Sequence, residues 1–292
     1  MLVDNDHSQL VTCGTVFQGT CQSRTLTNIS LYKINVIPKL TYAFVASTDP
    51  SHSAVAFIAP GPSNSKQLYV GTDDRPTSRL YEGRKFTCGV TRRYLRTLGT
   101  GSTSEEIFAI QRPNVDELGS FAILRKEAAT SPDFVVTYMS GFSVGNFSYF
   151  LSTQPAVYAS NSSTKRTSKL SQVCHNDPLF DSYVEMPITC QSNGREYNLV
   201  QAATVLHPGT RLASRLGLSI TEHLLVAAFY DGQDSALCVY QLTDIRRRFT
   251  ENIQACYNSA SLLVGRQFLG PSRYCYAETV SQTDVFSVCH CL

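Results

Sequence analysis

The chain has 292 residues, of which 42% are hydrophobic and 16% charged, which is enough apolar material for a folded core in one or two domains. Its 25 basic and 23 acidic residues give a formal net charge of +2, and this near balance excludes a strong overall field for nucleic acid or an anionic membrane. The longest apolar run, 224–230, is far shorter than the roughly 18–20 residues that cross a bilayer, so we expect no membrane insertion by this chain.

Short runs of β-branched and aromatic residues, separated by Gly, Pro, Asn and Ser, predict a mainly β protein. The expected strands are 9–13, 55–58, 67–70, 134–139, 147–151, 199–205, 224–230 and 236–242. The regular alternation of these strands with turns is typical of a sandwich or of a propeller of up-and-down blades, and the length of the chain favours the propeller.

Two segments break the β pattern and predict helices. In 209–218, Leu212, Ala213 and Leu216 follow helical spacing. In 244–256, Ile245 and Phe249 begin an apolar stripe, and we expect the arginines of this segment on the opposite side. Helices within blades indicate an insertion.

The arginine runs Arg92-Arg93 and Arg246-Arg247-Arg248 are local and lack interleaved stacking aromatics. We interpret both runs as solvent-exposed faces and exclude nucleic acid as a partner.

Gly141-Phe142-Ser143-Val144-Gly145 has the G-x-S-x-G form of a nucleophile elbow, which needs a strand before the serine and a helix after it. The residues after Gly145 are aromatic and favour a strand. We therefore expect the two glycines to serve a hairpin turn, and we keep a secreted serine hydrolase using Ser143 only as an alternative from another class.

The remaining motifs predict neither a metal site nor a cofactor. The six histidines form no H-x-x-x-H pair, and the adjacent residues Cys289, His290 and Cys291 cannot readily direct three side chains at one ion. No phosphate-binding glycine motif is present.

Ten cysteines without C-x-x-C pairs are typical of a disulfide-bonded extracellular protein. Three N-x-S/T sequons, at Asn28, Asn146 and Asn161, are expected glycosylation sites in such a protein. The residues after Met1 show neither part of a signal peptide, so we expect the sequence to begin inside a larger protein.

The segment 171–190, SQVCHNDPLFDSYVEMPITC, followed by YNLVQAA at 197–203, resembles the extracellular sema domain of a plexin, of the B type or from an invertebrate. Further matching blocks in family order are CGTVFQGTC at 13–21, LYVGT at 68–72, 147–154, 235–240 and 255–257. The likeness is weak over 75–133.

This resemblance implies an all-β fold, a seven-bladed propeller with a small helical insertion. It implies that 1–292 is a partial sema domain, incomplete at both ends, with the start of the first blade and the final blade missing. It also implies four disulfides, Cys13–Cys21, Cys174–Cys289, Cys190–Cys238 and Cys256–Cys275, which leave Cys88 and Cys291 unassigned.

By the same resemblance, the function is that of a semaphorin receptor ectodomain, not an enzyme, on the extracellular face of the plasma membrane as part of a single-pass receptor. A receptor homo-oligomer or a co-receptor is a further expected partner. In the family the semaphorin meets the part of the propeller that corresponds to the early and middle part of this chain, while the contact residues stay unassigned.

Two other interpretations stay open. The sema domain of a hepatocyte growth factor receptor-type tyrosine kinase shares the S-Y-x-E-M-P and N-L-V-Q-A-A patterns, although Cys256-Tyr257 and the spacing to Cys275 fit plexins better. The sequence also fits an unproductive transcript with no function of its own.

Overall fold

The computed structural model of the chain describes residues 1–15, 19–34, 45–47, 49–73, 80–81, 84–85, 89–95, 107–108, 110, 120–124, 134–156, 165–258 and 269–270. β-strands dominate these residues, as the sequence predicts.

Most strands belong to four antiparallel sheets that follow one another along the chain, except that β20, near the end of the chain, joins the second sheet. The first sheet contains β1 (Leu2–Asp4), β2 (Gln9–Cys13), β3 (Cys21–Thr25) and β4 (Asn28–Ile34). The second contains β5 (Ala54–Pro60), β6 (Lys66–Thr72), β9 (Gly89–Tyr94), β10 (Phe121–Leu124) and β20 (Leu269–Gly270). The third contains β11 (Thr137–Val144), β12 (Phe147–Pro155), β13 (Arg166–Cys174) and β14 (Val184–Pro187). The fourth contains β17 (Leu199–Leu206), β18 (Leu224–Tyr230) and β19 (Ser235–Gln241).

Two small hairpins accompany the four sheets, one from β7 (Leu80–Tyr81) and β8 (Arg84–Lys85), the other from β15 (Cys190–Ser192) and β16 (Arg195–Tyr197). A short 3-10 helix, η1 (Pro62–Asn64), connects β5 to β6.

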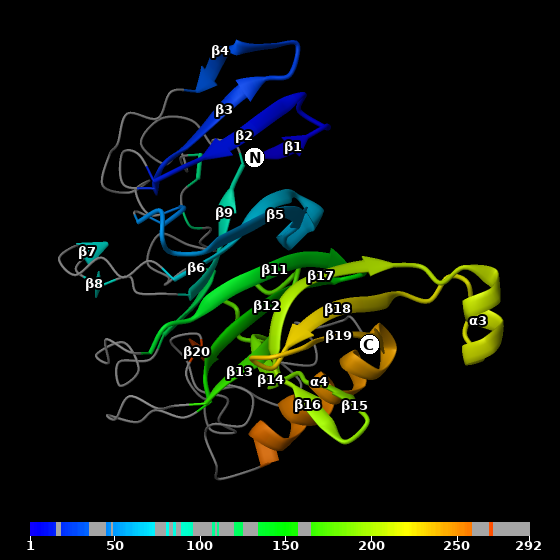
Figure 1. The fold of residues 1–292 in the computed structure, drawn as a ribbon. Helices are drawn as coiled ribbons and strands as arrows, with labels where there is room; N and C mark the ends of the chain where they lie inside the picture. The colour runs from blue at the N-terminus through cyan, green and yellow to red at the C-terminus, as the bar shows by residue number, and fades with distance from the viewer. Residues whose placement is uncertain are drawn as a thin grey trace.

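The first strands of the four sheets lie side by side (Figure 1): β1 contacts β5, β5 contacts β11, and β11 contacts β17. A cavity opens beside three of these strands and is lined by Leu2, Val55 and Met139 among other residues. Antiparallel sheets that share an axis through their first strands are the blades of a propeller. The described sheets therefore have the arrangement of a β-propeller.

Each pair of neighbouring sheets encloses its own apolar core. Alternation along β12 shows how the strands supply both sides, because Phe150 faces the second sheet while Tyr149 and Leu151 face the fourth. Between the first and second sheets the core includes Val11, Leu68, Val70 and Phe108. Between the second and third it includes Tyr69, Val90, Phe134, Phe150 and Phe180, and between the third and fourth Tyr149, Leu151, Leu225, Phe229 and Phe249.

The sheets differ in how their faces are covered. In β12 all but the first residue are buried, whereas exposure alternates along β17 and β19. We call the exposed side of the fourth sheet its outer face; on it Leu237 is 69% exposed and Val239 48%. The opposite side of the same sheet packs on the third sheet.

The helix α4 (Leu242–Asn258) follows β19 and confirms the helix expected over 244–256. Ile245 and Phe249 are buried in the core between the third and fourth sheets, and Arg247 and Arg248 are exposed. Arg246 departs from the expectation, because its guanidinium turns inward, with Nε 3.3 Å from Tyr149 Oη and Nη2 donating to Val144 O at 3.1 Å.

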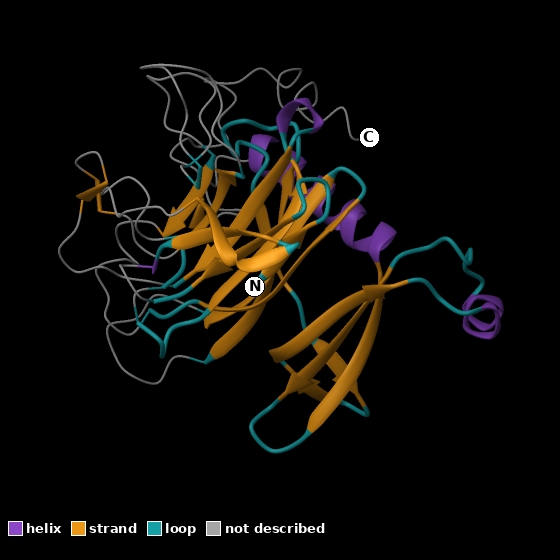
Figure 2. Cartoon of the chain, turned by 90° about the horizontal axis from the view of Figure 1, so that it is seen from above, coloured by secondary structure: helices purple, strands orange, loops and turns teal. Residues whose placement is uncertain are grey.

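The helix α3 (Thr210–Leu216) lies between β17 and β18 and ends at Gly217, whose φ of 65° is the left-handed conformation typical of a helix end. The two strands carry it away from the sheets (Figures 1 and 2). Of its expected apolar residues Ala213 is buried, whereas Leu212 is 41% and Leu216 50% exposed.

Strand boundaries agree closely where polar residues flank the apolar run, as for β18, and less well elsewhere. β11 begins at Thr137, although the expected strand begins at 134; Phe134 and Val136 precede the strand and are buried in the core. The apolar residue Leu242, expected to end a strand, begins α4 instead.

Candidate functional site

Ser143 lies near the end of β11, and a strand rather than a helix follows it. The chain turns at Gly145 and Asn146 into β12, and Ser143 pairs with Ser148 across the hairpin. Gly145 has φ +61°, a conformation that favours glycine. A nucleophile elbow requires a strand-to-helix turn, so the geometry does not favour the hydrolase alternative.

Gly141 has a different role from Gly145. It lies inside β11, where a Cβ atom would come 2.6 Å from Phe57 Cε1 and 2.9 Å from Val55 Cγ1. Glycine is needed here for the close approach of β5. The expectation that both glycines serve the turn is therefore wrong for Gly141.

The structure places His175 beside Ser143, a contact that the sequence gives no signal for. Ser143 Oγ lies 3.1 Å from His175 Nε2, and the imidazole also hydrogen-bonds to the backbone of Phe147. Burial, together with the nearby charge of Arg92, lowers the pKa of His175 to about 4. A base this weak is poorly matched to activating a serine at neutral pH, and a backbone group orients the ring where a triad has a carboxylate.

Arg92 is completely buried, which corrects the expectation of a solvent-exposed arginine pair. It lies on β9, and its guanidinium reaches the loop after β13, donating to His175 O at 2.9 Å and to Asp177 O at 2.5 Å. It also donates to Ser120 Oγ at 2.8 Å and lies 5.2 Å from the ring centre of Phe180. The charge pattern of the sequence does not show that β9 lies between two other strands of its sheet and beneath this loop, which is why Arg92 is buried.

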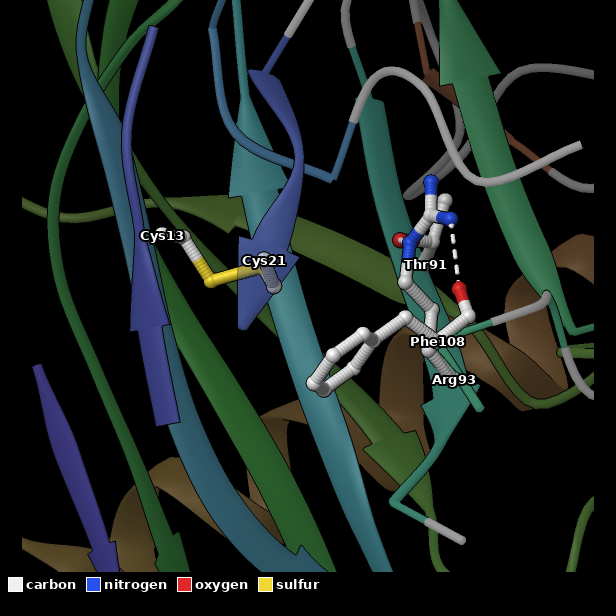
Figure 3. Close-up of a disulfide and its surroundings, with 5 residues drawn as sticks. All are labelled: Cys13, Cys21, Thr91, Arg93 and Phe108. Atoms are coloured by element: carbon white, nitrogen blue, oxygen red, sulfur yellow. Dashed lines mark hydrogen bonds between the residues drawn. A yellow bond between two sulfur atoms is a disulfide. The ribbon is translucent and has the colours of Figure 1, made fainter. Parts of the chain in front are cut away.

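Arg93, which points to the other side of β9, is also buried, with 4% of its surface exposed. Its Nη1 donates to Phe108 O at 3.0 Å and its Nε to Thr91 Oγ1 at 3.1 Å (Figure 3). Main-chain or hydroxyl oxygens therefore accept hydrogen bonds from both arginines.

The loop that receives Arg92 is part of the segment that carries the strongest family resemblance. Within it the Asp177 carboxylate accepts hydrogen bonds from Ser182 N and Ser182 Oγ, both at 2.6 Å, and from Leu179 N at 3.0 Å. Ser182 Oγ also accepts from Cys174 N at 3.0 Å. The D-P-L-F-D-S-Y pattern thus builds a buried loop that joins the second and third sheets.

Two of the four implied disulfides are present in the structure. Cys13–Cys21 joins β2 to β3 (Figure 3), and Cys190–Cys238 joins β15 to β19. Cys174 is also disulfide-bonded. Its implied partner Cys289 lies outside the described residues, as do Cys88, Cys275, Cys291 and the side chain of Cys256.

The structure exposes two of the three sequon asparagines. Asn28 begins β4, and its Oδ1 accepts a hydrogen bond from Ser30 N at 3.1 Å. Asn146 lies at the exposed turn between β11 and β12, and Asn161 falls outside the described residues. Glycosylation stays a prediction at all three positions.

Within the ranges that the structure describes, no three His, Cys, Asp or Glu side chains gather as a metal site. None of the helices described is both long and apolar enough to span a membrane.

Comparison with known proteins finds a match to the sema domain family over residues 200–277. Plexin-A4 of Mus musculus is 30% identical over 278 residues, covering 90% of this chain and 14% of that protein. Plexin-A4 of Danio rerio is 31% identical with the same coverage, and plexin-A2 of Mus musculus is 28% identical over 98% of this chain and 15% of its own length. These are A-type plexins; the expected likeness to a B-type or invertebrate plexin stays a prediction.

Solved structures agree with the sequence matches. The full extracellular region of plexin A4 superposes with a TM-score of 0.74 and 29% identity, covering 94% of this chain and 30% of the other. Drosophila Semaphorin 2a shares the fold alone, at a TM-score of 0.54 and 14% identity, over 98% of this chain and 45% of its own. Sequence and fold together relate this chain to the extracellular sema region of the plexin family.

Proposed function

We propose that this chain is part of the ligand-binding propeller of a plexin-type receptor and that it recognises a semaphorin outside the cell. The observation that carries the proposal is the agreement with plexin-A4 in sequence over 90% of the chain and in fold at a TM-score of 0.74. The chain spans only 14% of the length of that relative, so the partner is inferred from the family.

Recognition of this kind uses a broad rigid surface rather than a reactive group. A protein partner covers about 800 Å² on each side, more than one loop supplies. Buried contacts such as those of Arg92 and Asp177 hold the loops between the sheets in place, which lowers the entropy lost on binding. The weak basicity of His175 and the strand after Ser143 support a non-enzymatic role.

We propose that the complete propeller has seven blades and that residues 1–292 supply a partial ring, incomplete at both ends. The exposed apolar outer face supports this, because Leu237 and Val239 lie where another blade would cover them. Val3 on the first sheet is 52% exposed and supports an uncovered face at the other end.

The proposed location is the extracellular face of the plasma membrane, within a single-pass receptor whose membrane segment lies elsewhere. The disulfides of the first and fourth sheets support an oxidising compartment. We include Cys174–Cys289, Cys256–Cys275 and glycans on the three sequons in this proposal, with a receptor homo-oligomer or a co-receptor as a further partner.

The test is binding of the 292-residue chain, secreted from animal cells, to immobilised semaphorin ectodomains in surface plasmon resonance. We expect saturable binding to at least one semaphorin, and equal binding by a Ser143→Ala variant, because Ser143 pairs within the hairpin and its hydroxyl lies against His175. A folded chain that binds none of the semaphorins would contradict the proposal. Covalent labelling of Ser143 by a fluorophosphonate, lost in the same variant, would favour the hydrolase alternative.

A further inference from the structure

The outer edge of the first sheet is formed by a long, exposed strand. β4 is the last strand in the order of that sheet, and in the described part of the chain it pairs with β3 alone (Figure 1). Ile29 of β4 is 58% exposed and Leu31 is 59% exposed. The unpaired N–H and C=O groups of such an edge can pair with a strand of another molecule.

The pairing of β4 with β3 is also irregular. Asn28 and Tyr32 pair with residues of β3, whereas residues 29–31 between them have no opposite partner on that strand. A strand whose register is weakly specified is prone to alternate pairing. The exposed side chains of Ile29 and Leu31 would add apolar contact to such a pairing.

The outer edge of the third sheet differs from that of the first. β14 has four residues where β4 has seven, it ends in Pro187, and α4 packs beside it. Short edge strands, proline and a covering helix all hinder edge-to-edge pairing. Residues 28–31 of β4 include neither a proline nor a charged side chain. The edge at β4 therefore requires a different protection.

We propose that an N-linked glycan on Asn28 protects this edge from pairing with a second copy of the chain. The sequon Asn28-Ile29-Ser30 begins the strand itself, and Asn28 is exposed. Asn28 Oδ1 accepts a hydrogen bond from Ser30 N at 3.1 Å, and this bond does not use the amide nitrogen to which a sugar is joined. A glycan is bulky and solubilising, so it keeps a second strand away from the start of β4.

The proposal rests on the proposed extracellular location, because N-glycosylated sequons are a feature of secreted proteins. Transfer of the sugar from a lipid pyrophosphate donor forms the bond between sugar C1 and Asn28 Nδ2 and breaks the bond between C1 and the phosphate oxygen. The amide proton leaves with the lipid pyrophosphate. The glycan acts on the association state of the chain and not on semaphorin binding, so the two proposals can fail separately.

Sedimentation velocity of the 292-residue chain secreted from animal cells tests the proposal by comparing Ser30→Ala with Ser30→Thr. Both variants keep Asn28 and the N–H group that donates to it, but only the threonine variant keeps the sequon. We expect Ser30→Thr to stay monomeric like the parent chain and Ser30→Ala to self-associate at least about ten-fold more tightly. Trimming the folded parent chain with an endoglycosidase should have the same effect, and it keeps the test valid if Ser30→Ala is not secreted.

Two further variants locate the effect on the strand edge. Adding Leu31→Lys to Ser30→Ala places a charge on β4 and should restore the monomer. Asn146→Gln removes the sequon at the exposed turn between β11 and β12, away from the outer edge of its sheet, and should leave the chain monomeric.

Four results would overturn the proposal. They are an Asn28 without sugar in peptide mapping of the secreted parent chain, a Ser30→Ala variant as monomeric as Ser30→Thr, association that Leu31→Lys does not reverse, and equal association in Asn146→Gln. The last result would mean that the sugars act through general solubility rather than at β4.

Discussion

The two faces of the third sheet are held to their neighbours by different interactions. Toward the second sheet, the apolar core surrounds the buried guanidinium of Arg92, which hydrogen-bonds to a loop of the third sheet. Toward the fourth sheet and α4, apolar side chains around Phe229 and Phe249 form the core, and hydrogen bonds of Arg246 and Ser168 lie beside it. We call these the polar junction and the apolar junction.

The difference teaches which property each junction requires. Hydrogen bonds from Arg92 need defined positions, and removing the cation leaves several buried oxygens without a donor. Apolar packing requires volume and tolerates changes that preserve it. The polar junction should therefore be the more sensitive to conservative substitution.

The largest expected effect comes from Arg92→Met, which keeps much of the side-chain length but leaves the carbonyl oxygens of His175 and Asp177 without their donor. We expect the free energy of unfolding to fall by about 3–5 kcal/mol in urea denaturation, because each buried acceptor left without its donor costs about 1–3 kcal/mol. Arg92→Lys should also destabilise strongly, because one ammonium cannot reproduce the planar set of donors.

Arg248→Met is the matched control, because Arg248 is exposed on α4. Its cost should stay within about 0.5 kcal/mol. Similar losses for the two arginines would remove the distinction between the junctions.

The second-largest effect is a pH dependence of the unfolding free energy, caused by His175 in the polar junction. The unfolded chain binds a proton at this imidazole near the ordinary pKa of 6.5, whereas the folded chain does so only near 4. The unfolded state thus binds more protons between these values, and stability falls as the pH falls through them, by on the order of 3 kcal/mol. His175→Gln should flatten the curve of unfolding free energy against pH between 6.5 and 4. An unchanged slope in that variant would show that other groups cause the dependence.

A smaller effect is expected from Gly141→Ala on β11, where the added methyl group would overlap Phe57 and Val55. Overpacking of this kind costs about 1–3 kcal/mol, measured as a lower thermal midpoint. Gly14→Ala serves as the control, since nothing lies within 4 Å of its Cβ position and its φ is outside the left-handed region. Equal midpoints for the two variants would contradict the close approach of β5 and β11.

The smallest effect should come from Phe249→Leu in the apolar junction. Phe249 is fully buried beside Tyr149, their ring centres 6.3 Å apart, and leucine retains much of its volume. We expect a loss of about 1–1.5 kcal/mol in urea denaturation. A loss as large as that of Arg92→Met would mean that both junctions demand equally defined contacts.

The sequence predicts the repeated features of the fold well. Alternating or continuous apolar runs locate most strands, and polar flanking residues fix the ends of β18 at Leu224 and Tyr230. The stripe of Ile245 and Phe249 locates α4. Such patterns are local, so a single strand or helix is enough to read them.

Long-range contacts explain what the sequence could not show. Arg92 donates hydrogen bonds to the main-chain oxygens of His175 and Asp177, which lie more than eighty positions later in the sequence. The charges near Arg92 in the sequence do not reveal that this loop buries it. Gly141 looks like a turn glycine until β5 is placed against it. The His175–Ser143 contact likewise exists only because the hairpin and the loop after β13 are adjacent in space.

The acceptors around Arg92 have a consequence for how this region diverges among relatives. Main-chain oxygens of His175 and Asp177 receive the cation, and Pro178 O receives the hydroxyl of Ser120 that Arg92 also contacts. Every amino acid carries a main-chain oxygen. These hydrogen bonds therefore constrain the path of the loop backbone more than the identity of the loop's side chains. Neutral drift at several positions of this loop can therefore proceed while the arginine and the carboxylate that folds the loop are retained.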